Sequence, residues 1–456
     1  MDKRQLFETT KPVKALAIMA LPTVASQIII LVYNLADTWF IGRTDNPYMI
    51  GASNLAVTVY LVTASLANVF GVGGGSLMAR LIGEKDTDNA KKVASYSITI
   101  SMYAALAFSL LTLVLMTPLL MLLGANDNTM EYGKQYLLTT VVFGGVPTVL
   151  SMSMPQMLRN AGYAREAGIG VGLGSILNVA LDPLFMFVIL PEGKEVLGAG
   201  IATMISNYCS LIYFLLVFRK IRNESVLRFT VKKERINGIF KKSLYSVGIP
   251  AAIAIFLFDL VTIVINRLAV GYGDEHLAAM GIVLKVERIP INIGLGICLG
   301  MVPLLAYNFG AQNKRRMAEI AAIAFRTILI FSVLCTVVFR IFAGSIVGAF
   351  IDNQETVRLG TIFLTGRCFA LPFMLVGYFF VNYMNAIDQG KVSFLLAILR
   401  HVILIIPILF LMNTLFGLDG LTWSQLVADA LNVTISTVIY FKVKKKLHLT
   451  KADAIA

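Results

Sequence analysis

Carboxylate and amide side chains occur inside otherwise apolar stretches of this 456-residue chain. Asp37 stands in the first long apolar stretch, one helical turn after Asn34, and Asp182 stands in a later one, four residues after Asn178. In a helix, a spacing of four places Asn178 and Asp182 on the same face. A carboxylate inside a membrane-spanning helix is costly unless it is paired, hydrated or protonated, so these acids predict a functional site.

Further oxygen atoms are expected near these two acids. Pro183 directly follows Asp182 and has no N–H, which should free backbone carbonyls one turn earlier, and Thr203 offers a hydroxyl. Carboxylate, amide and hydroxyl oxygens suit a hard cation such as Na⁺. Two neighbouring carboxylates, which resist being charged together, also suit a proton carrier. The alternative is a set of separate hydrogen bonds between packed helices.

The second half of the chain carries a different set of charges in its apolar stretches. Asp259 and Glu287 are acidic, and Lys285 and Arg288 flank Glu287. Glu287 either forms a structural salt bridge with Lys285, Arg288 or Arg400, or it recognises cationic ligands or takes part in a gating switch. Asp259 and Glu287 are therefore candidates for lining a substrate cavity.

Methionines and cysteines carry less information. Met152 and Met157 would suit a cavity that repacks around varied ligands, although methionine is also an ordinary lipid-facing residue. The four cysteines lie far apart in apolar stretches and are interpreted as small buried hydrophobic residues. The sequence contains no HExxH or GxSxG motif. The chain is therefore expected not to be an enzyme, and to need no cofactor beyond a bound Na⁺ or H⁺.

The elements that must position these residues are membrane-spanning helices. Hydrophobic residues make up 57% of the chain and charged residues 14%, compared with about 25% charged residues in soluble domains, and the mean hydropathy is +0.78. This composition excludes a soluble enzyme, a disordered chain and a nucleic-acid-binding domain. Twelve apolar stretches are long enough to cross about 30 Å of hydrocarbon. They cover residues 15–42, 50–82, 93–118, 136–159, 167–190, 197–218, 243–271, 277–311, 318–350, 361–385, 393–416 and 421–441.

The distribution of lysine and arginine predicts the orientation in the membrane. Loops on the side of the N-terminus hold 27 basic residues, whereas the opposite loops hold only Arg43, Lys134, Lys194 and Arg358. Both termini are therefore expected in the cytoplasm. The net charge of +13 is then explained by topology and by attraction to anionic lipid, so no nucleic-acid partner is expected.

The two halves of the chain resemble each other. Leu21-Pro22 opens the first apolar stretch as Ile249-Pro250 opens the seventh, and Ala79-Arg-Leu-Ile-Gly83 corresponds to Ala306-Tyr-Asn-Phe-Gly310. Because six spans per repeat is an even number, both halves insert the same way up. We predict an all-α membrane protein with twelve transmembrane helices in two six-helix bundles, related by a pseudo-two-fold axis along the membrane normal. The predicted parts are an N-terminal tail (1–14), an N-terminal lobe (15–218), a basic linker (219–242), a C-terminal lobe (243–441) and a C-terminal tail (442–456).

Several motifs along the chain are similar to those of a known transporter family. They are Pro22 and Asp37 in the first span, Leu158-Arg-Asn-Ala-Gly162, Asn178-Val-Ala-Leu-Asp182-Pro183, Gly198-Ala-Gly-Ile-Ala-Thr203, and Pro303 with Asn308-Phe-Gly310-Ala311. With these motifs the whole chain resembles the multidrug and toxic compound extrusion (MATE) family, in its bacterial MepA-like branch.

The resemblance implies a secondary-active exporter that works as a monomer in the bacterial cell membrane. Entry of Na⁺ or H⁺ would drive export of cationic or amphipathic small molecules by alternating access, which can cause antibiotic resistance. The positions that match the family's cation site are Asp37, Asn178, Asp182 and Thr203, with Asn34 beside them. The alternative is a lipid-linked oligosaccharide flippase of the same superfamily, and no motif supports an intramembrane enzyme.

Overall fold

The computed structural model describes residues 3–44, 46–228 and 235–449, and all regular structure in these ranges is helical. The first repeat contains α2 (Pro12–Gly42), α3 (Pro47–Gly83), α4 (Thr87–Leu122), α5 (Asp127–Leu137), η1 (Leu138–Phe143), α6 (Gly145–Asn160), α7 (Ala164–Leu184), η2 (Phe185–Ile189) and α8 (Glu195–Ile221). The second contains α9 (Gly238–Val270), α10 (Asp274–Gly310), α11 (Lys314–Gly348), α12 (Gln354–Arg367), η3 (Cys368–Ala370), α13 (Leu371–Ala386), α14 (Gly390–Ile398), η4 (Leu399–Ile405) and α15 (Ile406–Lys446). The predicted all-α fold is confirmed.

The described residues contain ten helical runs that are long and apolar enough to cross a membrane, and the bent pair formed by Asp127–Phe143 and Gly145–Asn160 is an eleventh. One of the ten, Gly390–Lys446, has 57 residues, which corresponds to roughly 86 Å, more than twice the thickness of a hydrocarbon core. Gly417 interrupts this run with φ 57° and ψ −131°. The run therefore supplies two spans, in agreement with the twelve predicted.

Matching helix ends support the predicted repeat. The helices α3 and α10 each contain 37 residues. Each is followed by a left-handed residue, Lys85 with φ 64° in the first half and Gln312 with φ 56° in the second. The next helices then begin alike, because Asp86 and Asn313 each cap the N-terminus by accepting a hydrogen bond from the backbone N–H three residues later.

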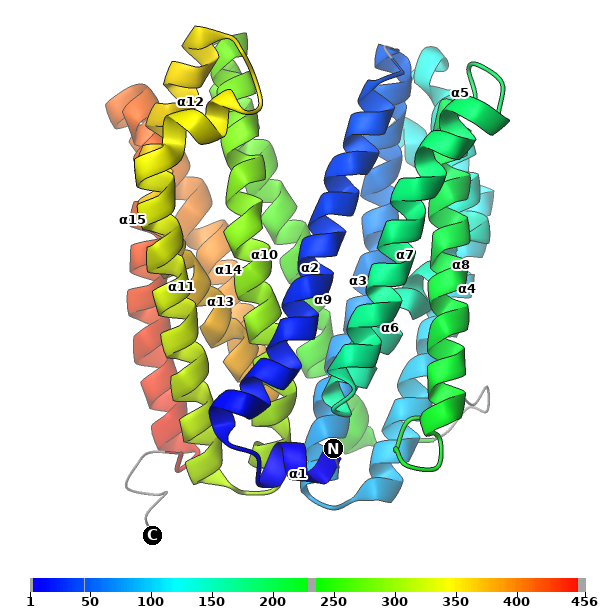
Figure 1. Ribbon diagram of the computed structural model, residues 1–456, viewed down its shortest axis with the longest axis vertical. Helices are drawn as coiled ribbons and strands as arrows, with labels where there is room; N and C mark the ends of the chain where they lie inside the picture. Colours follow the sequence, from blue (N-terminus) through cyan, green and yellow to red (C-terminus); the bar gives the residue numbers. More distant parts are fainter. Residues whose placement is uncertain (1–2, 45, 229–234, 450–456) are drawn as a thin grey trace. The chain divides into compact units, whose positions relative to one another are not determined.

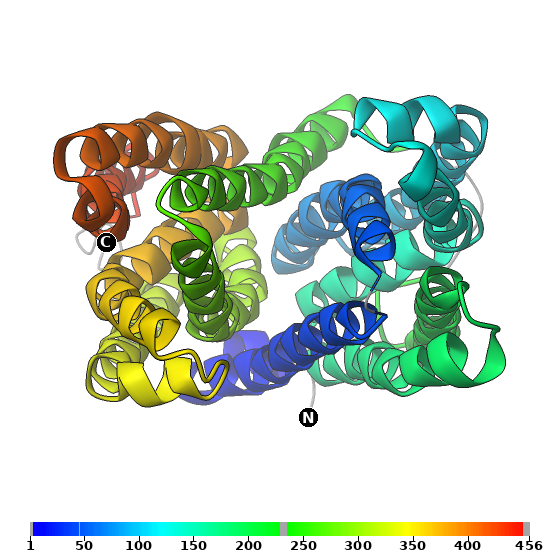
Figure 2. The ribbon, with the colours of Figure 1, turned by 90° about the horizontal axis from the view of Figure 1, so that it is seen from above.

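The described residues divide into two compact units of side-by-side helices (Figures 1 and 2). The first comprises the described parts of Met1–Phe7 and Ala25–Ala252, and the second comprises Glu8–Val24 with the described parts of Ile253–Ala456. The beginning of α2 thus belongs to the second unit, and the beginning of α9 belongs to the first. The predicted lobes, 15–218 and 243–441, differ from the observed units at these two helices.

Glycines explain why the beginning of α2 packs in the second unit and the beginning of α9 packs in the first. In the second unit, a Cβ added at Gly296 of α10 would lie 2.7 Å from the Cα of Val24, and one at Gly300 would lie 2.6 Å from the Cα of Ala20. In the first unit, a Cβ added at Gly73 of α3 would lie 3.0 Å from the Cα of Gly248 in α9. Only glycine permits such close approach of two helix backbones.

The predicted N-terminal tail and basic linker are partly structured. The N-terminal tail forms the short helix α1 (Lys3–Glu8), and Tyr307 donates a hydrogen bond to the carboxylate of Glu8 at 2.6 Å. Arg316 donates to the carbonyl of Thr10, also at 2.6 Å. In the described part of the basic linker, Leu227 is buried in the hydrophobic core of the first unit. Local hydrophilicity therefore did not reveal that these segments pack on the helices.

Candidate ion-coupling site

The centre of the candidate site is a buried hydrogen-bonded group on α7 and α8. Asn178 and Asp182 stand one turn apart on α7, and Thr203 stands on α8; all three side chains are buried. With its amide oriented to satisfy both terminal atoms, Asn178 donates from Nδ2 to Oδ2 of Asp182 at 3.0 Å. Its Oδ1 then accepts from the hydroxyl of Thr203 at 3.2 Å and from the Thr203 backbone N–H at 3.1 Å. The structure brings together these three of the five residues that the sequence singled out for this site.

The local backbone explains why this group forms here. Pro183 has no N–H to offer the carbonyl of Val179, which lies next to Asn178. The chain then continues as the π-helical segment η2, a feature that is frequent at functional sites. Gly198 of α8 lies directly against the backbone of Phe185, because a Cβ atom added at Gly198 would lie 2.8 Å from the carbonyl carbon of Phe185. This close contact aligns α8, and with it Thr203, beside α7.

Asp37 of α2 lies near this group within the first unit. Its side chain is half-buried, and its negative charge acts electrostatically on Asp182. Tyr33 and Tyr136 interact electrostatically with both carboxylates. The sequence did not single out these tyrosines, although a tyrosine hydroxyl inside an apolar stretch is itself a signal of a polar site. Asn34, in contrast, is exposed, and its side chain forms no hydrogen bond with the cluster among the described residues.

In the part of the chain that the structure describes, the two carboxylates have no positively charged partner. The buried Oδ1 atoms of Asp37 and Asp182 have no hydrogen-bond partner among the described residues, and no described lysine, arginine or histidine forms an ion pair with either acid. The described residues also contain no group of three or more His, Cys, Asp or Glu side chains that could bind a metal ion. The carboxylate, amide and hydroxyl oxygens present therefore suit a proton or a hard cation better than a soft transition metal.

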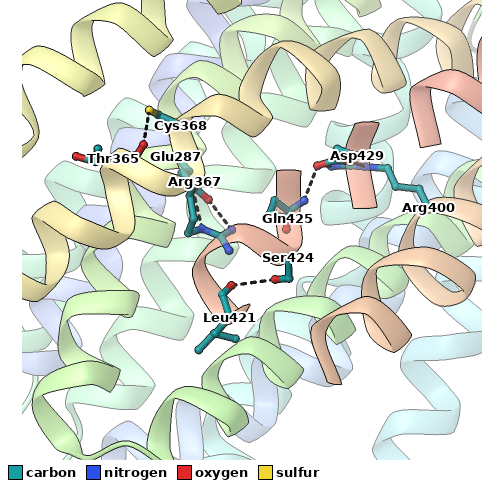
Figure 3. Close-up of polar contacts among 9 residues, drawn as sticks. All are labelled: Glu287, Thr365, Arg367, Cys368, Arg400, Leu421, Ser424, Gln425 and Asp429. Atoms are coloured by element: carbon teal, nitrogen blue, oxygen red, sulfur yellow. Dashed lines mark hydrogen bonds and ion pairs between the residues drawn. The ribbon is translucent and has the colours of Figure 1, made fainter. Parts of the chain in front are cut away.

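The second unit neutralises its buried acid Glu287 on α10 by pairing it with Arg367 on α12 (Figure 3). The two carboxylate oxygens accept from Nε and Nη2 of Arg367, both at 2.9 Å, and the side chains are 4% and 1% exposed. The expectation that Glu287 would pair with Lys285, Arg288 or Arg400 is therefore wrong. Glu287 could not have been assigned to Arg367 by local spacing, because 80 residues separate them.

A second buried pair joins Arg400 of η4 to Asp429 of α15 (Figure 3). Nε of Arg400 lies 2.7 Å from Oδ1 of Asp429, and Gln425 donates to Oδ2 of the same carboxylate at 2.5 Å. The guanidinium carbon of Arg400 lies 4.7 Å from the centre of the Tyr378 ring. In each of these two pairs of the second unit, the buried arginine and the buried acid therefore cancel each other's charge.

The other residues proposed for a substrate cavity receive little support. Met157 is fully buried in the hydrophobic core of the first unit, so it does not line a cavity. Met152 is partly buried and packs against a small core cluster that contains Ala67 and Val149. Both fill gaps between helices, a role that the flexible methionine side chain performs well. The side chain of Asp259 lies outside the part of the chain that the structure describes.

Both the sequence and the fold are similar to those of known proteins. The family model described as MatE matches residues 22–184 and 250–411. The multidrug export protein MepA of Staphylococcus aureus (strain MSSA476) is 31% identical over 450 residues, covering 98% of both chains. Solved structures of a MATE protein in complex with MaL6 and of an outward-facing multidrug resistance MATE family transporter of the MOP superfamily share the fold. Their TM-scores are 0.90 and 0.89, at 21% and 20% identity, and they cover 98% and 99% of this chain and 100% and 99% of their own.

Proposed function

Because the chain belongs to the multidrug and toxic compound extrusion (MATE) family, we propose that it exports amphipathic small molecules, many of them cationic, out of the bacterial cell. It is a multi-pass membrane transporter and not an enzyme. The flippase alternative is not favoured, because the similar proteins are multidrug exporters. The arginines that could have bound a pyrophosphate, Arg367 and Arg400, are paired with acids in the second unit.

We infer that the coupling ion binds in the first unit, at Asp37, Asn178, Asp182 and Thr203. The observation that supports this proposal is the contrast between the units: Glu287 and Asp429 each have an arginine partner, whereas Asp182 has none among the described residues. A buried carboxylate without a counter-charge is costly, so a proton or a cation is needed to compensate it.

Each residue has a definite task in this proposal. Asp182 supplies the charge, and its free Oδ1 faces the ion. Asn178 holds the other carboxylate oxygen and is itself held by Thr203, which prevents the carboxylate from turning away. Asp37 adds a second carboxylate from α2. Ion binding then changes the relative free energies of two arrangements of these helices. A change of this kind is required to couple ion entry to drug export.

The choice between Na⁺ and H⁺ is open to a direct test. The purified protein would be reconstituted in vesicles with a fluorescent cationic dye, and a Na⁺ gradient and a pH gradient would be imposed separately. We expect at least one gradient to drive dye movement, and the ionophore that collapses that gradient to stop it. Dye movement that responds to neither gradient would refute ion-coupled export. Because the proposed site lies wholly within the first unit, we propose that a single chain is the transport unit.

We propose that both termini are cytoplasmic, on the strength of the asymmetry of 27 basic residues against four in the loops. In a cysteine-free background, single cysteines at Asn128 and Gly193 should react with a membrane-impermeant maleimide added to intact cells. A cysteine at Asn223 should react only after the cells are opened. Labelling of the cysteine at position 223 in intact cells would contradict the proposed orientation.

A further inference from the structure

Arg159, the last residue but one of α6, is a buried cation of the first unit. The residue is 5% exposed, and its Nη1 donates to the side-chain oxygen of Gln156 at 3.1 Å. Its Nε has no hydrogen-bond partner, and no acid forms an ion pair with it, within residues 3–44, 46–228 and 235–449. Arg367 and Arg400 of the second unit each bind a carboxylate, whereas Arg159 binds a neutral amide.

The charge of Arg159 is therefore not compensated by the part of the chain that the structure describes. A buried guanidinium is costly when its neighbours are neutral. The carbonyl groups at the C-terminus of α6 attract a cation, but the effect of a helix dipole is much smaller than the cost of burying an uncompensated charge. A bound anion would remove this cost.

A buried hydroxyl without a partner lies on the neighbouring helix α4. Ser95 is 4% exposed, and its Oγ has no hydrogen-bond partner among the described residues. The other serines of α4 behave differently, because Ser97, Ser101 and Ser109 donate to backbone carbonyls at 2.8, 2.8 and 2.7 Å. A serine inside a helix commonly forms such a bond. The hydroxyl of Ser95 is thus available as a donor to a group that the described chain does not supply.

The packing of α4 against α6 is defined at two places. A Cβ added at Gly145, the first residue of α6, would clash with the Oγ of Ser109. Ala105 and Val149 belong to one small buried cluster. Moving four residues back along α4 thus corresponds to moving four residues forward along α6. The two helices are therefore antiparallel, with a register that pairs Ser109 with Gly145 and Ala105 with Val149.

This register places Ser95 and Arg159 opposite each other. Ser95 lies fourteen residues before Ser109, and Arg159 lies fourteen residues after Gly145. Fourteen residues correspond to about 21 Å and to almost four complete turns. Both helices are uninterrupted between these positions. Ser95 and Arg159 therefore reach the same level of the interface and point in nearly the same directions as Ser109 and Gly145.

We propose that Ser95 and Arg159 bind a small monovalent anion, such as chloride, between α4 and α6 of the first unit. The guanidinium supplies the charge and an N–H donor, and the hydroxyl supplies a second donor. Ala94, Ile98 and Leu158 are buried around this level in the hydrophobic core of the unit. Such apolar surroundings favour a small, weakly hydrated anion over phosphate or sulfate, which lose more hydration on burial.

Replacing chloride with gluconate tests the anion site without any dye or gradient. The purified protein in nanodiscs would be titrated with sodium chloride against sodium gluconate, at constant sodium concentration and ionic strength. The melting temperature should rise with chloride and then saturate, because a ligand that binds only the folded state stabilises it. Arg159→Gln should abolish this response. Arg159→Lys, which keeps the charge, should retain part of it.

Ser95→Ala provides the more selective test, with Ser97→Ala as its matched control. Loss of the Ser95 hydroxyl should weaken the apparent affinity for chloride about tenfold or more, the effect expected for one hydrogen bond to a charged group. In gluconate, Ser95→Ala should be at least as stable as the wild type, because it removes a buried hydroxyl that has no partner in the described chain. Ser97→Ala removes a hydroxyl that donates to a carbonyl, so it should keep the wild-type affinity for chloride.

The results are independent of the proposed export function. Equal melting temperatures of the wild-type protein in chloride and gluconate would refute the anion site. A chloride response that survives unchanged in Ser95→Ala would also refute it, since chloride would then act elsewhere. If Arg159→Gln does not fold, the comparison of Ser95→Ala with Ser97→Ala still decides the question. Bromide, which should replace chloride, would reveal the position of the site by its anomalous scattering in crystals.

Discussion

Replacing Asp182 with asparagine is expected to abolish gradient-driven export. The substitution keeps the shape of the side chain and the contact with Asn178, but it removes the charge that attracts a proton or a cation. Asp37→Asn should have a similar effect, because Asp37 supplies the second carboxylate of the cluster. The measurement is initial dye transport in vesicles under the gradient that drives the wild-type protein.

Stability should distinguish lost coupling from lost folding. Asp182 is a buried acid with no positive partner among the described residues, so removing its charge relieves a desolvation cost and should not lower the melting temperature. Asn34→Ala provides a matched control, since Asn34 is exposed on the same helix as Asp37, one turn away. This variant should export normally. Near-normal gradient-driven export by Asp182→Asn would disprove the proposed site.

The proposed ion-coupling cluster was largely predictable from the sequence because its members are close along the chain or carry a distinctive motif. Asn178 and Asp182 are one turn apart, so helix geometry alone brings them together. Thr203 stands in α8, which is connected to α7 by η2 and a short loop, and the MATE-like motif marked its position. The tyrosines Tyr33 and Tyr136 were missed, because aromatic residues are frequent in apolar helices and only the fold shows that these two approach the acids.

The features that were not predictable depend on contacts between distant segments. Apolar length predicted the twelve spans well, but it contains no information on which half of α2 or α9 packs with which unit. That exchange depends on glycines such as Gly248 and Gly300, whose role becomes visible only when the opposing backbone is known. The pairing of Arg400 with Asp429 was likewise hidden. Even a rule that pairs every acid in a span with a base would not have identified Arg400 as the partner of Asp429, because the spans contain several arginines.

The partnership of Glu287 with Arg367 changes what is expected of a Glu287 variant. Glu287→Gln leaves a buried arginine without its carboxylate, at a cost of about 3–5 kcal/mol. The melting temperature and the protein yield should fall, and transport of cationic and neutral dyes should decline together. A loss restricted to cationic dyes, at an unchanged melting temperature, would instead support direct recognition of drug cations by Glu287.

Two further variants locate the cause of this instability in the buried charge. The combined replacement Glu287→Met with Arg367→Met removes both charges and fills the space with apolar atoms, so it should recover most of the stability lost by Glu287→Gln. Glu355→Gln is the matched control, because Glu355 forms a pair with Arg358 on the same helix as Arg367, but both side chains are exposed. Water and salt screen that pair, so its loss should have little effect. If the double replacement is less stable than Glu287→Gln, cancelling the two charges does not account for the whole contribution of the pair to stability. The two hydrogen bonds between Glu287 and Arg367 then stabilise the fold in their own right.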